Sequence, residues 1–157
     1  MAHEPPRMTL ALENINAYYG ESHILRNVSF TIEPGEVVCL MGRNGMGKTT
    51  TLKTLTGLLP ARSGTITFEG RDITQDRTDL RAKRGLAYVP QGREISPHLT
   101  VHQNLLLGYW NRPSITGDVS EKDAFDEVYH LFPKLTQILH RPGGVLSGGE
   151  QQQLAIG

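Results

Sequence analysis

The part of the chain best suited to chemistry is a glycine-rich segment that ends in a lysine and a threonine. Residues 42–49 have the form G-x-x-x-x-G-K-[ST], and Thr50 follows. Glycine lets the backbone curl closely around a polyphosphate, so that its N–H groups hold the phosphates. Lys48 would reach the β and γ phosphates, and the Thr49 hydroxyl would ligate Mg²⁺. The pattern predicts a phosphate-binding loop for a nucleotide, made of Gly42, Arg43, Asn44, Gly45, Met46, Gly47, Lys48, Thr49 and Thr50.

Such a loop needs a buried strand before it and a helix after it, and the sequence predicts both. The apolar residues 37–41 predict the strand, with Cys39 as a packed small side chain rather than a nucleophile. Residues 49–56 predict the helix, and Gly57 is placed to end it. The apolar side chains expected on one face of this helix are Leu52, Leu55, Leu58 and Leu59. The alternative is an ordinary glycine turn before a helix.

A second helix start in the chain is also suited to binding an anion. In residues 146–151, Leu-Ser-Gly-Gly-Glu-Gln, Ser147 is placed as an N-cap and Glu150 completes a capping box with it. Gly148 and Gly149 would leave the first amides of that helix open to a phosphate. The alternative is a capped helix after a loop, with no ligand.

The remaining pattern predicts an α/β protein. Alternation predicts strands at residues 10–16, 24–32, 65–70 and 86–89, with a tight turn at 33–36 and a short helix near 79–84. Helices are expected to begin at Thr100 and Ser120, on either side of a loop at 111–119. The second helix carries an apolar stripe typical of helix packing, made of Ala124, Phe125, Val128, Leu131 and Phe132.

Bulk composition excludes some classes of function. The 157 residues carry 16 basic and 16 acidic side chains, which disfavours a nucleic-acid or anionic-membrane binder. Residues 1–7 lack the apolar core of a signal peptide, and no apolar run is long enough to cross a bilayer. A cytoplasmic location is expected.

The order of these motifs resembles that of ABC-transporter ATPases. Residues 146–151 resemble their signature motif, residues 88–91 (Tyr-Val-Pro-Gln) their Q-loop, and Tyr19 with Gly20 their adenine-stacking aromatic. The resemblance implies a P-loop NTPase fold: a RecA-like core with an N-terminal antiparallel β region and an α-helical subdomain. It implies a core with the β region at 1–95, a helical subdomain at 96–146 and the start of the signature helix at 147–157.

The resemblance also implies roles for individual residues. Tyr19 would stack on adenine, although Tyr18 could take that role, or both could be packing residues at a strand end. Gln91 would contact Mg²⁺ together with Thr49 and assist catalysis, the alternative being an ordinary exposed glutamine. Ser147, Gly148, Gly149 and Glu150 would meet the γ-phosphate of ATP bound by a second subunit, so a homodimer or heterodimer is expected.

Finer resemblance points to one group of importers. Residues 88–95 and 99–101 look like the ATPases of branched-chain amino-acid uptake systems and of related urea importers, and residues 18–26 and 147–157 lean toward the urea member. Ser96 departs from this group, which usually has a bulky aromatic there. The implied partners are membrane subunits of the transporter, and the implied place is the inner face of the cell membrane.

The resemblance also defines what the 157 residues do not contain. No strand ending in Asp-Glu follows the signature, and none of the histidines, His140 included, stands where the family has its switch histidine. We therefore expect nucleotide binding without useful turnover, and marginal stability, because in the family strands from that later region lie between the phosphate-loop and Q-loop strands. A non-hydrolysing fragment or remnant and a soluble, non-transport ABC ATPase remain as alternatives.

Overall fold

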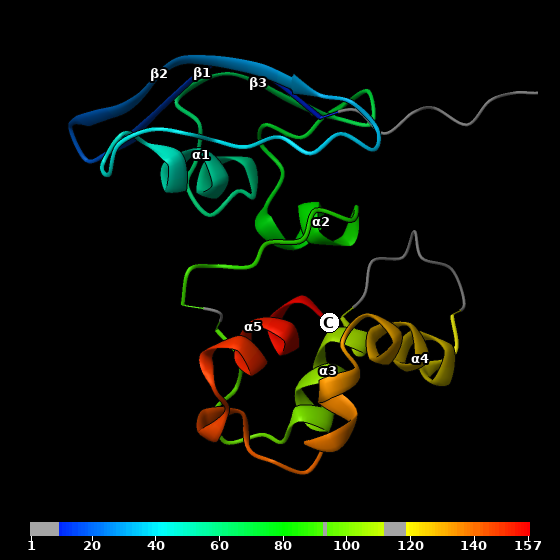
Figure 1. Ribbon diagram of the computed structural model, residues 1–157. Coiled ribbons are helices and arrows are strands. Elements are labelled where there is room, and N and C mark those ends of the chain that lie inside the picture. Colours follow the sequence, from blue (N-terminus) through cyan, green and yellow to red (C-terminus); the bar gives the residue numbers. More distant parts are fainter. Residues whose placement is uncertain (1–9, 93, 112–118) are drawn as a thin grey trace, which may run out of the picture. The chain divides into compact units, whose positions relative to one another are not determined.

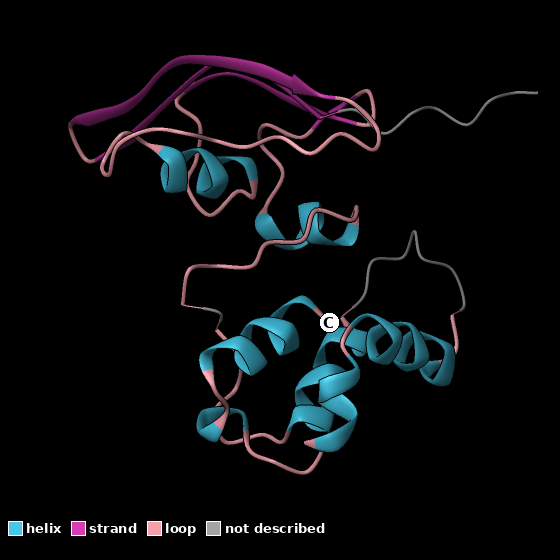
Figure 2. Ribbon diagram, viewed as in Figure 1, coloured by secondary structure: helices cyan, strands magenta, loops and turns pink. Residues whose placement is uncertain are grey.

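The structure is a computed structural model that describes residues 10–92, 94–111 and 119–157. These residues fall into two compact units, Met1–Ala82 and Lys83–Gly157. The first unit carries the strands together with helices, and the second is helical (Figure 2). The described residues do not include most of the loop expected at 111–119. They also do not include residues 1–7, whose sequence lacks the apolar core of a signal peptide.

The first unit is built on an antiparallel sheet. Its strands are β1 (Leu10–Tyr19), β2 (Ser22–Ile32), β3 (Ser63–Phe68) and β4 (Arg71–Asp72), in the order β2-β1-β3-β4. The antiparallel β region expected from the resemblance is therefore present, and helix α1 (Lys48–Leu55) lies on one side of it (Figure 1). The apolar core under the sheet consists of Leu10, Leu12, Ile15, Ala17, Leu25, Leu55, Ile66, Phe68 and Ile73.

Strand β1 runs three residues beyond its predicted end at Asn16. Buried residues fall at even positions up to Leu12 and at odd positions from Ile15 onward. Between these two residues the pairing with β2 shifts register, and Asn14 adopts a φ of 52°. A bulge of this kind inserts one residue and returns the following side chains to the same face. Gly64 is required opposite, because a Cβ there would lie 2.5 Å from the Asn14 carbonyl oxygen. Simple alternation in the sequence could not show the strand continuing past the bulge.

Helix α1 forms as predicted but buries a different face. Threonines 50, 51 and 54 are buried beside Leu55, whereas Leu52 and Leu58 are exposed. The leucine face predicted from the sequence is therefore wrong at Leu52 and Leu58, whereas Leu55 is buried and Leu59 is half-buried. Threonine tolerates burial in a helix when its hydroxyl bonds a carbonyl one turn back, as Thr51 Oγ1 does to Gly47 O at 3.0 Å. The helix ends as expected, with Thr56 as C-cap and Gly57 at a φ of 79°.

The predicted strands at residues 37–41 and 86–89 are not formed. Both segments are irregular, and no described residue pairs with either of them. Val37 is 96% exposed and Met41 87%, and Cys39 is exposed, so its prediction as a packed side chain is wrong. An isolated strand leaves its backbone N–H and C=O groups without partners, so apolar sequence alone does not produce one.

The second unit is a cluster of short helices around its own core. They are α3 (Val101–Trp110), α4 (Glu121–Leu131), the 3₁₀ helices η2 (Pro133–Gln137) and η3 (Gly143–Val145), and α5 (Gly148–Ile156). Thr100 caps α3 in a capping box with Gln103, and Ser120 caps α4 by accepting a hydrogen bond from Asp123 N, as the sequence predicts. The core side chains are Val101, Leu105, Phe125, Leu135, Ile138, Leu146 and Leu154.

The short helix α2 (Thr78–Lys83) closes the first unit at the place that the sequence predicts for it. It contains one buried charged residue, Arg81. No sequence pattern distinguishes this arginine from the others in the segment.

Candidate functional site

The glycine-rich loop has the backbone conformation that its glycines permit. Gly42, Gly45 and Gly47 have φ angles of 154°, 83° and 92°, a region that other residues rarely adopt. The loop is closed by a turn in which Met46 N donates to Arg43 O at 3.3 Å. A Cβ on Gly47 would lie 2.9 Å from Leu25 Cδ2, so this glycine lets the loop pack closely on β2.

Lys48 points back into the curl of this loop. Its ammonium donates to Gly42 O at 2.7 Å and to Arg43 O at 2.9 Å. An ammonium has three N–H donors, so two hold the side chain across the loop and the third is left for an anion seated there. The lysine is already oriented before any ligand arrives, which lowers the entropy lost on binding.

The start of α1 is free of a competing side-chain cap. Gly47 is the N-cap in a left-handed conformation, and no side chain caps the helix at this end. Thr49 is exposed in the first turn, whereas Thr50 is buried. The helix therefore presents backbone N–H groups, the positive end of its dipole and one exposed hydroxyl at the same end.

The two neighbouring tyrosines of β1 have different surroundings. The Tyr18 ring stacks on His23 with centroids 4.2 Å apart, and Arg62 lies 4.8 Å from the ring centroid. Tyr19 is 47% exposed at the end of the hairpin, opposite Ser22 in the strand register. Of the two rings, Tyr19 is the one that can accept a flat ligand without displacing a stacked neighbour.

The second predicted anion site has the local structure expected of it. Ser147 is the N-cap of α5, Glu150 N donates to Ser147 Oγ, and Ser147 N donates to Glu150 Oε2 at 2.8 Å, so the capping box is formed. Gly148 and Gly149 are exposed. No described atom lies within 4 Å of where a Cβ on Gly149 would be. The helix start is therefore open to a large ligand.

The charge of the carboxylate in this capping box is partly balanced by neighbouring donors. The hydrogen bond from Ser147 N, with that from the Ser147 hydroxyl, holds the pKa of Glu150 below its usual value. Arg141 Nη1 lies 3.9 Å from Glu150 Oε1. Because the charge of Glu150 is turned toward Ser147 and Arg141, it opposes an incoming anion less than a free carboxylate would.

Asn104 fixes the segment that precedes α3 beside the start of α5. It accepts from Ser96 N at 2.8 Å and donates to the carbonyls of Ser96, Leu99 and Thr100. A Cβ on Gly143 would lie 3.0 Å from Ser96 O, and Gln151 of α5 donates to Gly143 O at 3.3 Å. An asparagine inside a predicted helix gives no sequence signal for this role. Gln91 lies in this second unit with its side chain exposed.

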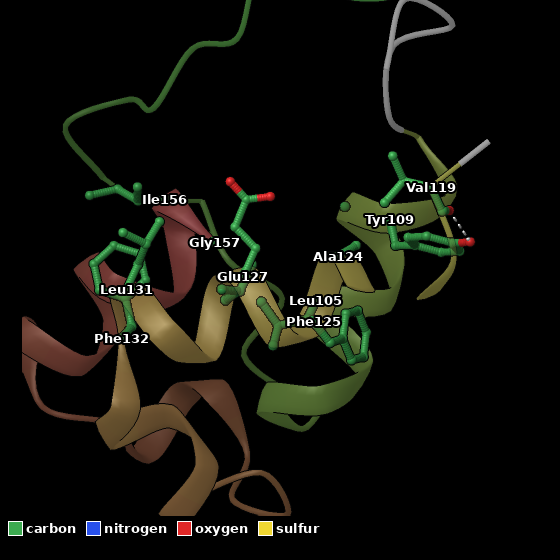
Figure 3. A pocket seen from close by; sticks show the side chains of 12 residues that line it. Leu105, Tyr109, Val119, Ala124, Phe125, Glu127, Leu131, Phe132, Ile156 and Gly157 are labelled. Carbon is green, nitrogen blue, oxygen red and sulfur yellow. Dashed lines mark hydrogen bonds between the residues drawn. The ribbon is translucent and has the colours of Figure 1, made fainter. Parts of the chain in front are cut away.

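An apolar hollow of about 330 Å³ lies between α3, α4 and the end of α5 (Figure 3). The predicted stripe of α4 lines it, and Phe125 reaches through to the core of the unit, so the interpretation of this stripe as helix packing is confirmed there. Leu131 instead remains 63% exposed. The hollow also includes Glu127, Ile156 and Gly157.

The described residues contain neither a membrane-spanning helix nor a cluster of metal-ligating side chains. None of the helices there is long and apolar enough to cross a membrane. No group of three or more His, Cys, Asp or Glu side chains in the same residues is placed to hold a metal ion.

Comparison with known proteins gives consistent matches. The family model described as "ABC transporter" matches residues 25–157. The high-affinity branched-chain amino acid transport ATP-binding protein BraG of Pseudomonas aeruginosa is 38% identical over 152 residues, which are 94% of this chain and 62% of BraG. The probable branched-chain amino acid transport ATP-binding protein LivF of Archaeoglobus fulgidus is 38% identical over 143 residues, which are 90% of this chain and 58% of LivF.

Solved structures agree with the sequence matches. A nucleotide-free ATP-binding cassette from an ABC transporter is similar with a TM-score of 0.76 at 30% identity, over 95% of this chain and 63% of that one. A dimeric bacterial ABC transporter cassette gives a TM-score of 0.77 at 25% identity, over 94% and 67%. The chain spans about 62% and 58% of the two curated relatives above. Because the family model matches residues 25–157, which are most of its length, the chain belongs to the ABC transporter family.

Proposed function

We propose that this chain is the ATP-binding part of a subunit that couples ATP binding and hydrolysis to import of branched-chain amino acids or urea. The observation that carries the proposal is the presence of two exposed, amide-rich helix starts, at Lys48 in α1 and at Gly148 in α5. Each is suited to phosphate, and they lie in different units of the chain. The relatives BraG and LivF are both described as branched-chain amino acid transport ATP-binding proteins, which supports branched-chain amino acids as the transported solutes.

In this proposal ATP is held first by the phosphate loop. The loop amides and Lys48 would bind the phosphates, and Tyr19 would stack on adenine. Thr49 and Gln91 fit the chemistry of Mg²⁺, which prefers oxygen ligands, because both have exposed oxygen-bearing side chains. When bound, Mg²⁺ neutralises charge that develops on the phosphates during transfer.

The signature helix would act on ATP held by a second subunit. Ser147, Gly148 and Gly149 leave α5 open at its N-terminus, while Glu150 stabilises that end through the capping box. A second copy or a related subunit, facing this one, would supply the phosphate loop opposite. The similarity to a dimeric cassette supports this arrangement. The same proposal places the protein on the cytoplasmic face of the membrane, bound to the transporter's membrane subunits.

Uptake measurements test both which solute is transported and whether its transport depends on ATP binding by this subunit. Cells that lack the gene would be complemented with the complete protein or with its Lys48→Ala variant, and uptake of labelled leucine and urea would be followed. We expect one of the two solutes to be taken up only with the unaltered protein, because Lys48 is needed to hold ATP. Equal uptake of that solute with Lys48→Ala would contradict the proposal.

The two tyrosines give a second prediction. Tyr19→Ala should weaken ATP binding by about 1–3 kcal/mol, the usual value of stacking a base on an aromatic ring, and leave inorganic triphosphate binding unchanged. Tyr18→Ala serves as the matched control, since that ring is stacked on His23. Titration calorimetry with both ligands measures the difference. A larger loss of ATP affinity in Tyr18→Ala than in Tyr19→Ala would assign the stacking role to Tyr18 instead.

A further inference from the structure

Helix α1 is held at both of its ends. At the N-terminal end, Gly47 packs against Leu25 of β2 so closely that a Cβ would clash. At the C-terminal end, the Arg81 guanidinium donates from Nη1 to Thr54 O at 3.0 Å and to Leu55 O at 2.6 Å. The last carbonyls of a helix have no partner within it, and a cation there also complements the helix dipole. Arg81 thus supplies a donor to the last carbonyls of α1, of which Thr54 O also accepts from Gly57 N at 3.2 Å.

The same guanidinium ties α1 to the chain that follows β4. Arg81 Nε donates to Asp76 O at 2.9 Å, and Nη2 donates to Thr74 O at 2.8 Å. Arg81 is 2% exposed, so its charge is removed from water and is stabilised by these carbonyls and by the nearby carboxylates of Asp76 and Asp72. A planar guanidinium can serve four carbonyls in this way, whereas a lysine ammonium has only three donors.

The glycine that ends α1 leaves room for this arginine. A Cβ on Gly57 would lie 3.0 Å from Arg81 Nε and 3.3 Å from Arg81 Cζ. Gly57 therefore has two roles: its positive φ ends α1, and its lack of a side chain leaves room for the Arg81 guanidinium. Nothing in the phosphate-loop motif itself accounts for a buried cation at the far end of its helix.

We propose that Arg81 is a positioning residue for the phosphate loop, acting through α1. The helix has eight residues and is about 12 Å long, so a tilt at its last carbonyls displaces Lys48 and the first amides at the other end. Arg81 is buried, and its four hydrogen bonds go to carbonyls of the fold, so its role would be indirect. It fixes the angle of α1 to the sheet, and so the direction in which the loop amides point. This inference rests on the proposed function in taking the ligand of the loop to be a polyphosphate.

Comparison of ligands with and without a triphosphate separates positioning from simple stabilisation. In the complete protein, Arg81→Met removes all four hydrogen bonds while it keeps an unbranched apolar stem. Arg77→Met is the matched control, because the Arg77 guanidinium is exposed and forms a surface ion pair with Asp79. Affinities for Mg-bound inorganic triphosphate, MgATP and adenosine would be measured on folded protein. We expect Arg81→Met to weaken both triphosphates by about tenfold, and adenosine by less than twofold.

Arg81→Lys gives an independent reading, because one ammonium can restore some but not all of the bonds. Arg81→Lys should show a loss of triphosphate affinity between those of the unaltered protein and Arg81→Met. If Arg81→Met does not fold, the same affinities are measured on Arg81→Lys. A lowered unfolding temperature with unchanged triphosphate affinity in the Arg81 variants would overturn the positioning role alone. Absence of triphosphate binding by the unaltered protein would overturn the proposed function and this inference together.

Discussion

Replacement of Lys48 by alanine should weaken MgATP binding to the complete protein by roughly 30-fold to 1000-fold, which is about 2–4 kcal/mol. The ammonium already lies across the loop through its bonds to the Gly42 and Arg43 carbonyls. Its removal takes away the cation nearest the bound phosphates and the contacts that hold the loop in its curled form. Titration with a fluorescent ATP analogue, and a hydrolysis assay on the same samples, measure the effect.

Lys53→Ala is the matched control for that experiment. Lys53 lies in the last turn of the same helix, so its replacement removes an equal charge from α1 without touching the loop. It should change the affinity by less than about twofold, since partly exposed charges at this distance are screened. Similar losses in the two variants would show that general charge, rather than the placement of Lys48, governs binding.

Gly149→Asp should abolish pairing of subunits and lower ATP hydrolysis by at least about a hundredfold, while ATP binding to the phosphate loop stays within about twofold. The position is open, so the new side chain fits without a clash, and a carboxylate in the first turn favours the helix itself. The same carboxylate would repel a phosphate presented by a facing subunit. The variant thus separates folding of α5 from its proposed role. Keeping a phosphate away from this helix start should cost at least as much as the loss of one stabilising donor from a transition state, which is typically a hundredfold or more.

Gly108→Asp makes the same substitution at an exposed, open glycine of α3 in the same unit. It controls for the added charge and for the change from glycine, and the complete protein that carries it should keep its hydrolysis rate. Hydrolysis by Gly149→Asp at the rate of this control would contradict a role for the signature helix in holding phosphate.

Local signals in the sequence predicted the elements whose structure is decided locally. The glycines of the phosphate loop, the capping boxes at Thr100 and Ser147 and the stop at Gly57 each specify a backbone geometry over a few residues, and the structure shows these geometries. The resemblance to a known family supplied the antiparallel region beside them. The roles of Tyr19, Gln91 and the signature residues in binding stay predictions.

Features that depend on distant partners could not be predicted in this way. Residues 37–41 and 86–89 have the composition of strands, yet a strand forms only beside another, and no described residue pairs with them. The same limit explains Cys39, whose expected burial depended on that pairing. Burial of Arg81 and of the threonine face of α1 follows from contacts across the fold, which apolar periodicity does not record.

The most direct test of the account is a titration of the complete protein with MgATP while nucleotide occupancy and molecular mass are followed together, by equilibrium binding and sedimentation. We expect occupancy of the phosphate loop to be accompanied by formation of a dimer, which Gly149→Asp should prevent without loss of occupancy. A protein that fills with ATP yet stays monomeric under conditions in which it hydrolyses ATP would contradict the claim that the helix starts at Lys48 and Gly148 serve one nucleotide from two subunits.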